Sequence, residues 1–199
     1  MARKNDQQRK ARLAAETGGQ YKSWNNKIRV ALVYPNHYTV GMSNLGFQTV
    51  YRLLNAMDHV VCERVFLPDS EHDPADVVSL ESASPLQAFH CVAFSLSFEN
   101  DFANMVEILQ KAELPLLSAQ RGASLPLIVA GGVSCFLNPE PIADFIDCFL
   151  LGEAEVLLAP FFDHYDPLRD RKAFLLEAAR TLPGVYVPAF YSPHYDRGF

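Results

Sequence analysis

Five short apolar runs divide the chain, and between them apolar residues recur at helical spacing. Apolar runs of this length that are rich in branched residues are typical of strands buried on both faces. The five predicted strands are residues 28–34, 59–65, 89–95, 126–130 and 146–151. The intervening segments predict helices over residues 44–57, from Asn100 or Asp101 onward, over 155–162 and over 172–180.

The alternation of strands and helices predicts the fold class. Parallel strands need long crossover connections, and these connections are right-handed. We therefore predict an α/β domain with a doubly wound, five-stranded parallel sheet covered by helices on both faces, in three layers α/β/α. The expected strand order is 2-1-3-4-5, as in Rossmann-like and flavodoxin-like sheets, with a switch point between the first and third strands.

Glycines and small polar residues gather directly after the predicted strands. Four clusters do so, at residues 34–41, 95–97, 131–132 and 152–155. In a parallel sheet these strand ends share one edge, and ligands of open α/β sheets bind in the crevice outside it. Gly41 and Gly46 flank the start of a predicted helix, where free amides suit an anionic group. A strand-to-helix turn without a ligand accounts for the same residues equally well.

Composition and charge narrow the class of protein. The chain has 199 residues, of which 49% are hydrophobic and 20% charged, as in soluble globular proteins. No apolar run is long enough to span a membrane, and no secretory signal follows the basic N-terminus. Residues 1–29 carry a net charge of +6 and the remainder −12. An acidic body makes a nucleic-acid partner unlikely on sequence grounds.

Cysteine spacing and segment composition suggest location and organisation. The four cysteines form no Cys-x-x-Cys pair, which gives no support for a zinc or iron–sulfur site and favours reduced thiols in a cytoplasmic protein. We expect three segments: a basic leader over residues 1–27, one domain over 28–182, and an extended connector over 183–199. No residue is predicted to be catalytic or to ligate a metal.

Several motifs together resemble one known family. They are YPNHYTVGMSNLG at 34–46, ERVF at 63–66, FSLS at 94–97, AGG at 130–132, NPEP at 138–141 and GEAE at 152–155. Over about residues 28–190 the chain resembles the cobalamin-binding-like N-terminal domain of radical S-adenosylmethionine (SAM) proteins. The resemblance implies a Rossmann-like sheet placed before a radical SAM barrel, which holds an iron–sulfur cluster and S-adenosylmethionine.

The chain departs from the family's pattern at two places. It has no Cys-x-x-x-Cys-x-x-Cys motif, so the iron–sulfur cluster and S-adenosylmethionine are expected only in a C-terminal barrel, present in cis or in trans. Cobalamin domains with a cobalt-ligating histidine carry Asp-x-His-x-x-Gly after the first strand. Aligned on Gly41, this chain has Asn36 for the aspartate and Tyr38 for the histidine, so the axial ligand is absent and cobalamin would be held without it.

The resemblance and the strand-end clusters together define the candidate site. The candidate cofactor-binding residues are Asn36, Tyr38, Gly41, Ser43, Asn44, Ser95, Ser97, Gly131, Gly132, Gly152 and Glu153. The expected function is to hold a cofactor or substrate at the carboxyl edge of the sheet, without catalysis by this chain alone. Two alternatives stay open: a scaffold or interaction domain without a ligand, and a module that binds flavin or another phosphorylated ligand.

Overall fold

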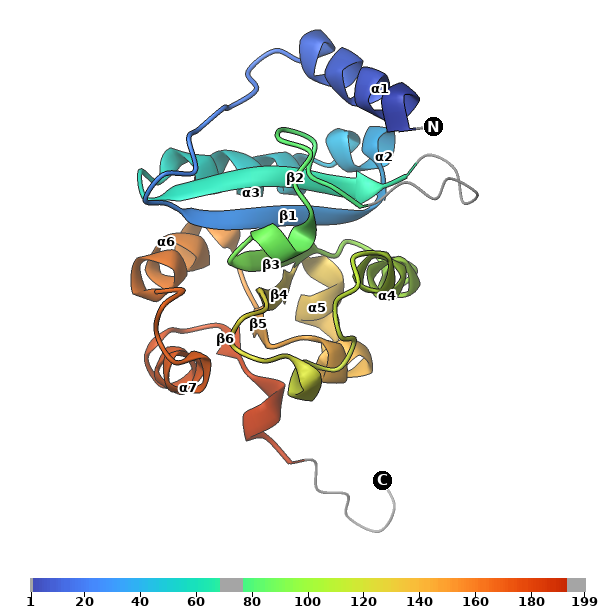
Figure 1. The fold of residues 1–199 in the computed structure, drawn as a ribbon. Coiled ribbons are helices and arrows are strands. Elements are labelled where there is room, and N and C mark those ends of the chain that lie inside the picture. Colours follow the sequence, from blue (N-terminus) through green and yellow to red (C-terminus); the bar gives the residue numbers. More distant parts are fainter. Residues whose placement is uncertain (1, 69–76, 193–199) are drawn as a thin grey trace.

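The computed structural model describes residues 2–68 and 77–192, which form a three-layer α/β fold (Figure 1). The strands are β1 (Ile28–His37), β2 (Val60–Leu67), β3 (Cys91–Ser95), β4 (Leu127–Gly131), β5 (Cys148–Leu150) and β6 (Val185–Tyr186). The α-helices are α1 (Ala2–Ala15), α2 (Tyr38–Ser43), α3 (Leu45–Ala56), α4 (Asp101–Lys111), α5 (Val133–Leu137), α6 (Ala154–His164) and α7 (Arg171–Thr181). Short 3-10 turns lie at Leu86–Ala88, Ser118–Gln120, Glu140–Phe145 and Pro188–Phe190.

The sheet has the order β2-β1-β3-β4-β5-β6. Its first five strands are parallel, which confirms the predicted 2-1-3-4-5 arrangement. The sixth strand was not predicted: Val185 and Tyr186 pair antiparallel with Leu150 and Phe149. The segment expected to be an extended connector from residue 183 therefore begins with an edge strand, and residues 193–199 lie outside the described part of the chain.

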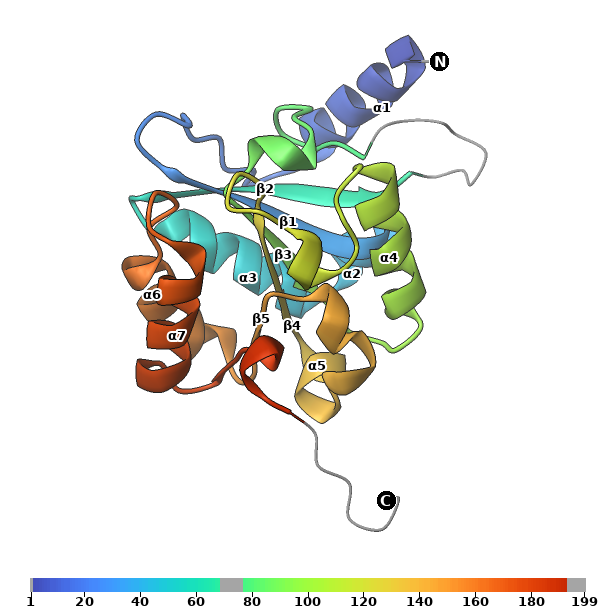
Figure 2. The ribbon, with the colours of Figure 1, turned by 60° about the horizontal axis from the view of Figure 1, so that its bottom comes forward.

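Alternating strand residues feed two hydrophobic cores, one on each face of the sheet. Leu32 and Val129 belong to the core beneath α3, α6 and α7, whereas Val33 and Ile128 belong to the core beneath α4 and α5. Figure 2 shows these two groups of helices on opposite sides of the sheet. Both faces are thus buried, which is why the strands read as continuous apolar runs in the sequence.

The segment after the first strand is more ordered than the sequence suggested. β1 continues past Pro35 to His37 through an irregularity in its pairing with β2, and α2 follows at once where a loop was predicted. Gly41 allows α2 to pack closely, because a Cβ atom there would lie 2.4 Å from Cε1 of the Phe66 ring. The predicted helix at 44–57 is present as α3, and the Asn44 side chain caps it by accepting from the Phe47 amide.

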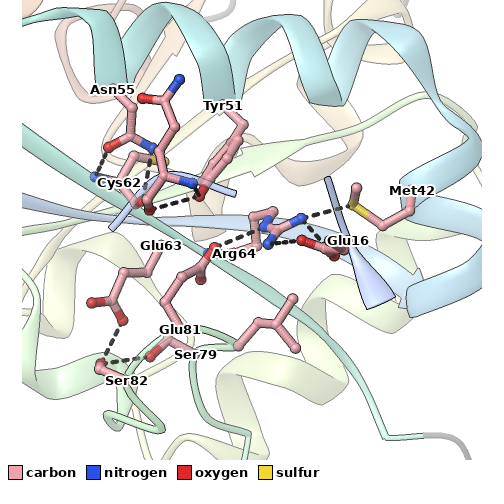
Figure 3. A network of polar contacts seen from close by, with 12 residues as sticks. Glu16, Met42, Tyr51, Asn55, Cys62, Glu63, Arg64, Ser79, Glu81 and Ser82 are labelled. Carbon is pink, nitrogen blue, oxygen red and sulfur yellow. Dashed lines mark hydrogen bonds and ion pairs between the residues drawn. The ribbon is translucent and has the colours of Figure 1, made fainter. Parts of the chain in front are cut away.

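The predicted leader packs against the edge strand β2 (Figures 1 and 3). The Glu16 carboxylate pairs with Arg64 at 2.7 Å on one face of β2. On the other face the Trp24 indole N–H donates to the Glu63 carboxylate at 2.6 Å. Two neighbouring buried charges of β2 are therefore satisfied by leader residues. Among the described residues, no helix is long and apolar enough to cross a membrane.

Candidate functional site

A cavity of about 600 Å³ lies at the carboxyl ends of β3, β4 and β5, between α3 and α6. Its floor is the row Leu32, Ala93 and Val129, which the strand register places side by side. Ser95 and Gly131 form the next row toward the edge. The small side chains of Ala93 and Ser95, and the absence of one at Gly131, leave space above the middle of the sheet.

The walls and the mouth of the cavity are largely apolar. Val50 of α3 and Leu157 and Leu158 of α6 form the walls. Phe98 and Phe136 lie at the mouth, where they are 64% and 65% exposed. The spacing of Phe98 in the sequence is typical of a core residue, but the structure exposes its side chain. Exposed aromatic rings beside a concave apolar site provide faces on which a flat ligand can pack.

One polar contact joins the start of α3 to the segment after β3 at the cavity. The Asn44 carboxamide nitrogen donates to the Ser97 hydroxyl at 3.1 Å, while its oxygen accepts from the Phe47 amide at 2.9 Å. Asn44 therefore fixes the start of α3 relative to the end of β3. Both side chains, together with Ser95, line the cavity and supply neutral hydrogen-bonding groups.

The charged side chains that line the cavity are both acidic. They are Glu153 and Glu155, at the start of α6. Among the described lining residues there is no lysine, arginine, histidine or cysteine. The described residues also contain no group of three His, Cys, Asp or Glu side chains arranged to hold a metal ion. This charge pattern favours a neutral or cationic ligand group over a phosphate.

The glycines of the site serve the packing of the chain as well as the cavity. Gly132 has a φ of +109°, and a Cβ atom there would lie 2.3 Å from the Leu96 carbonyl oxygen. The lack of a side chain at Gly132 therefore lets its backbone lie close to the backbone after β3. Gly131 has no such conflict, since its nearest neighbour would be the Leu150 carbonyl oxygen at 3.2 Å. Gly152, with a φ of +145°, permits the turn from β5 into α6.

The structure brings only part of the predicted site together. The residues that line the cavity are Asn44, Ser95, Ser97, Gly131, Gly132, Gly152 and Glu153. Asn36, Tyr38, Gly41 and Ser43 do not line it. α2 directs this group elsewhere, because Gly41 packs on Phe66 and the Ser43 hydroxyl donates to the Val40 carbonyl. The Asn36 side chain accepts from the His37 amide.

Tyr38, which the resemblance sets in place of the cobalt-ligating histidine of some cobalamin domains, faces the leader. Its hydroxyl donates to the Glu16 carboxylate at 2.6 Å, and its ring packs edge-on against Phe66. Burial, together with the hydrogen bond to Glu16, raises the pKa of the Tyr38 hydroxyl to about 12. The Arg12 guanidinium lies over the ring, 4.5 Å from its centre. Tyr38 is thus a packing residue between leader and body.

The sequence pointed to residues that follow strand ends. It did not point to the residues that shape the floor and the mouth of the cavity. Ala93 and Val129 lie inside predicted strands, and the predicted helices do not include Phe136. The available signal was register: in a parallel sheet, small residues two positions before adjacent strand ends lie side by side. Cys135, one position before Phe136, is buried, and burial raises the pKa of its thiol to about 12.

Comparisons with known proteins give one family. The family model described as radical SAM proteins, N-terminal, matches residues 46–188. An uncharacterized protein of Methanocaldococcus jannaschii is 27% identical over 132 residues, which is 63% of this chain. The chain spans about a quarter of the length of that relative, 24%. No solved structure matches the sequence significantly.

Proposed function

Because the chain belongs to the N-terminal family of radical SAM proteins, we propose that it is a binding domain that holds a small organic cofactor or substrate for a radical SAM barrel. The barrel, in cis or in trans, would supply the iron–sulfur cluster and S-adenosylmethionine. The binding domain would supply position and shelter, with no catalytic residue of its own. Glu153 and Glu155 have no basic or nucleophilic partner among the described residues that line the cavity.

The observation that carries the proposal is the cavity at the carboxyl edge. Its volume of about 600 Å³ lies within the range of small-molecule sites, roughly 300–1,000 Å³. It lies where open α/β sheets bind ligands. Its floor is made of small and branched side chains, and its neutral hydrogen-bonding side chains are those of Asn44, Thr49, Ser95 and Ser97. This lining suits a flat group that packs on apolar walls and makes a few hydrogen bonds.

Cobalamin, the cofactor implied by the resemblance, fits the cavity in part. Ligation of cobalt by this chain does not fit, because Tyr38 is paired with Glu16 away from the cavity and no histidine or cysteine lines it. The neutral aromatic base of a cobalamin tail would suit the apolar floor and the hydroxyls of Ser95 and Ser97, whereas the phosphate of that tail would have to lie away from Glu153 and Glu155. When bound, a corrinoid would supply methyl-transfer or redox chemistry, and this chain's residues would hold and orient it.

The flavin alternative meets an electrostatic obstacle. A flavin phosphate at the edge of the sheet would lie near Glu153 and Glu155, with no lysine or arginine among the described lining residues to offset them. An isoalloxazine ring without a phosphate does not meet this repulsion. We therefore expect riboflavin to bind better than flavin mononucleotide, if either binds.

The scaffold alternative is favoured by a different observation. Leu45 at the start of α3 and Leu137 at the end of α5 are 77% and 74% exposed, and Phe98 and Phe136 are exposed at the cavity mouth. Exposed apolar side chains that share one mouth, as Phe98 and Phe136 do, mark a surface that another folded unit covers. In a pure scaffold this unit alone would cover the cavity. In the binding domain, ligand and barrel would share the edge.

Reconstitution separates these functions. The purified chain is incubated with hydroxocobalamin, riboflavin or flavin mononucleotide and passed through a desalting column, and the visible spectrum of the protein fraction is recorded. Retained corrinoid or flavin that is lost in Ala93→Leu, which fills the cavity floor, supports the binding domain. Gly122→Ala serves as control, because no atom lies within 4 Å of a Cβ there. Retention of none of the three favours the scaffold.

A further inference from the structure

A second cavity, of about 380 Å³, lies on the other side of α3. Residues 16–20 of the leader form one wall, and Gln48, Tyr51 and Arg52 of α3 form the facing wall. The Arg64 side chain of β2 also lines this cavity. Thr49 of α3 lines both this cavity and the one at the carboxyl edge. The second cavity therefore exists only while the leader is docked against the body.

Three charged side chains line this cavity, Glu16, Arg52 and Arg64, and that of Arg64 is buried, with 2% exposed. Its Nη1 and Nη2 atoms donate to the two oxygens of Glu16 at 3.0 and 2.7 Å. Its Nε donates to Glu81 at 2.8 Å, and its guanidinium lies over the Tyr51 ring at 4.6 Å (Figure 3). The Arg64 guanidinium thus holds one carboxylate through both terminal nitrogens and a second through Nε.

The partners of Arg64 come from two different parts of the chain. Glu81 and Tyr51 belong to the body and support Nε and the ring face of the guanidinium. Glu16 belongs to the leader, 48 residues away in sequence, and occupies the two terminal nitrogens. The body alone therefore orients Arg64 so that its terminal nitrogens face the leader. Two parallel N–H donors are the geometry with which arginine recognises a carboxylate.

The charge balance keeps Arg64 in its ionised form. Burial opposes the charge, but the hydrogen bonds that Arg64 donates to Glu16 and the charge of Glu81 outweigh it and raise the pKa of Arg64 above its usual value. A buried guanidinium that lost its carboxylate would need another anion or water in its place. The adjoining cavity has room for the rest of a small molecule that brings such an anion.

Gly18 and Gly19 follow Glu16 and allow the leader segment 16–20, called the strap below, to change its conformation. Gly18 has a φ of +85° and no atom lies within 4 Å of a Cβ built there. Before Glu16, the leader is held by Arg9, whose guanidinium donates to the Leu80 and Glu81 carbonyls. After Glu16, the Gln20 amide and carbonyl form hydrogen bonds with the Tyr51 hydroxyl. Between these two attachment points, the Glu16 carboxylate contacts Arg64 and Tyr38.

We propose that Arg64 is a carboxylate-binding site in which Glu16 acts as an internal ligand, and that a small carboxylate can take the place of Glu16, with the rest of the molecule in the second cavity. This site is separate from the one at the carboxyl edge and does not rest on the function proposed for it.

The test is chemical rescue of the full-length variant Glu16→Ala by acetate. Removing the side chain leaves Arg64 facing an empty space that matches a carboxylate. We expect sodium acetate to raise the melting temperature of Glu16→Ala above that in sodium chloride of equal ionic strength, by roughly 3 °C at a concentration well above the dissociation constant. The wild-type chain, whose site Glu16 holds, should respond to the two salts alike.

Two control variants test whether the stabilisation by acetate depends on Arg64. Asp6→Ala removes a leader carboxylate that pairs with Arg9 and Lys10 near the surface, and acetate should then act no differently from chloride. Glu16→Ala combined with Arg64→Lys removes the paired donors, and the acetate effect should disappear. Should Glu16→Ala be unfolded in chloride, recovery of its folded circular dichroism signal by acetate becomes the measurement.

The proposal is overturned if acetate and chloride act equally on Glu16→Ala, or if acetate acts equally with Lys at position 64. It is also overturned if trypsin cleaves after Arg12 at the same rate in Glu16→Ala and the wild type in chloride, because an internal ligand must hold the strap closed. A faster cleavage in the variant supports it.

Discussion

The Asn55 carboxamide forms hydrogen bonds with both backbone groups of Cys62: its nitrogen donates to the Cys62 carbonyl at 3.0 Å, and its oxygen accepts from the Cys62 amide at 3.1 Å. Cys62 lies in β2, the edge strand of the sheet, so Asn55 takes the place of a neighbouring strand. Other groups satisfy the same edge, since Lys22 donates to the Val60 carbonyl and the Leu80 amide donates to the Arg64 carbonyl. The edge is thereby closed to pairing with another chain.

Asn55→Ala should destabilise the chain strongly. It leaves a buried amide and a buried carbonyl of Cys62 without partners, and each costs roughly 1–3 kcal/mol. We expect the free energy of unfolding in urea to fall by about 2–4 kcal/mol. Asn55→Asp keeps an acceptor for the Cys62 amide but sets a carboxylate against its carbonyl, so it should not restore the wild-type value. A change below about 0.5 kcal/mol for Asn55→Ala would show that the edge does not depend on this side chain.

The two adjacent glycines after β4 should respond differently to alanine. Gly132→Ala combines a φ of +109° with a Cβ atom 2.3 Å from the Leu96 carbonyl oxygen, and should lower the free energy of unfolding by about 3 kcal/mol or more. Gly131→Ala meets its nearest atom at 3.2 Å and should cost much less stability, while it narrows the carboxyl-edge cavity. Urea unfolding measures both, with Gly122→Ala as control. Equal losses at 131 and 132 would contradict this assignment.

The sheet can be predicted from the sequence because parallel strands that are buried on both faces appear as continuous apolar runs. The runs at 89–95 and 126–130 correspond to β3 and β4 within two residues. β6 is too short to form such a run, because a two-residue edge strand depends on its pairing with β5 and not on the local sequence pattern. The docking of the leader was equally hidden, because Glu16 and Arg64 meet across 48 positions and no local pattern encodes that contact.

The site was predictable where strand ends determine it. Ser95, Gly131 and Gly152 follow three strands whose ends share one edge, and they line the cavity. Tyr38 and Gly41 follow a strand as well, but α2 packs on Phe66 and carries them toward the leader. Such a displacement depends on side-chain packing between distant segments. The exposure of Phe98 likewise depends on where α4 begins relative to the cavity, which spacing along one chain does not encode.

Acid should weaken the fold through His90. The Arg29 amide donates to its Nδ1 at 3.1 Å, and the Arg29 guanidinium lies 2.6 Å from its Nε2. Burial and the charge of Arg29 lower the pKa of His90 below its usual value of 6.5. Below about pH 6.5 the unfolded chain therefore binds a proton that the folded chain does not, and the free energy of unfolding decreases as the pH falls.

His90→Gln isolates this contribution. Glutamine retains an acceptor for the Arg29 amide but cannot titrate. The decrease in the free energy of unfolding between about pH 7 and pH 5, measured with urea at each pH, should be smaller in His90→Gln than in the wild type. An equal decrease in both would mean that His90 takes up a proton as readily in the folded chain as in the unfolded one.

The thiols should be inert in the folded state. All four cysteines are free and buried. Burial raises the pKa of Cys62, Cys91 and Cys148 well above the usual thiol range and that of Cys135 to about 12. Because the thiolate is the reactive form, an aromatic disulfide reagent at about pH 8 should label the native chain only slowly. Guanidinium should expose four reactive groups. Rapid labelling of a native thiol would contradict the burial of that residue.

The path of residues 16–27 around β2 determines where this polypeptide can be divided. Glu16 reaches Arg64 on one side of the strand and Trp24 reaches Glu63 on the other, so one passing segment supplies a partner to each of these two buried charges. A cut at Ile28, where the first strand begins, would remove one partner from each and leave Arg64 with Glu81 and Glu63 with Ser82. The smallest autonomous folding unit therefore starts upstream of its first strand, and shortened versions should lose solubility in two steps, the first when Glu16 is removed and the second when Trp24 follows.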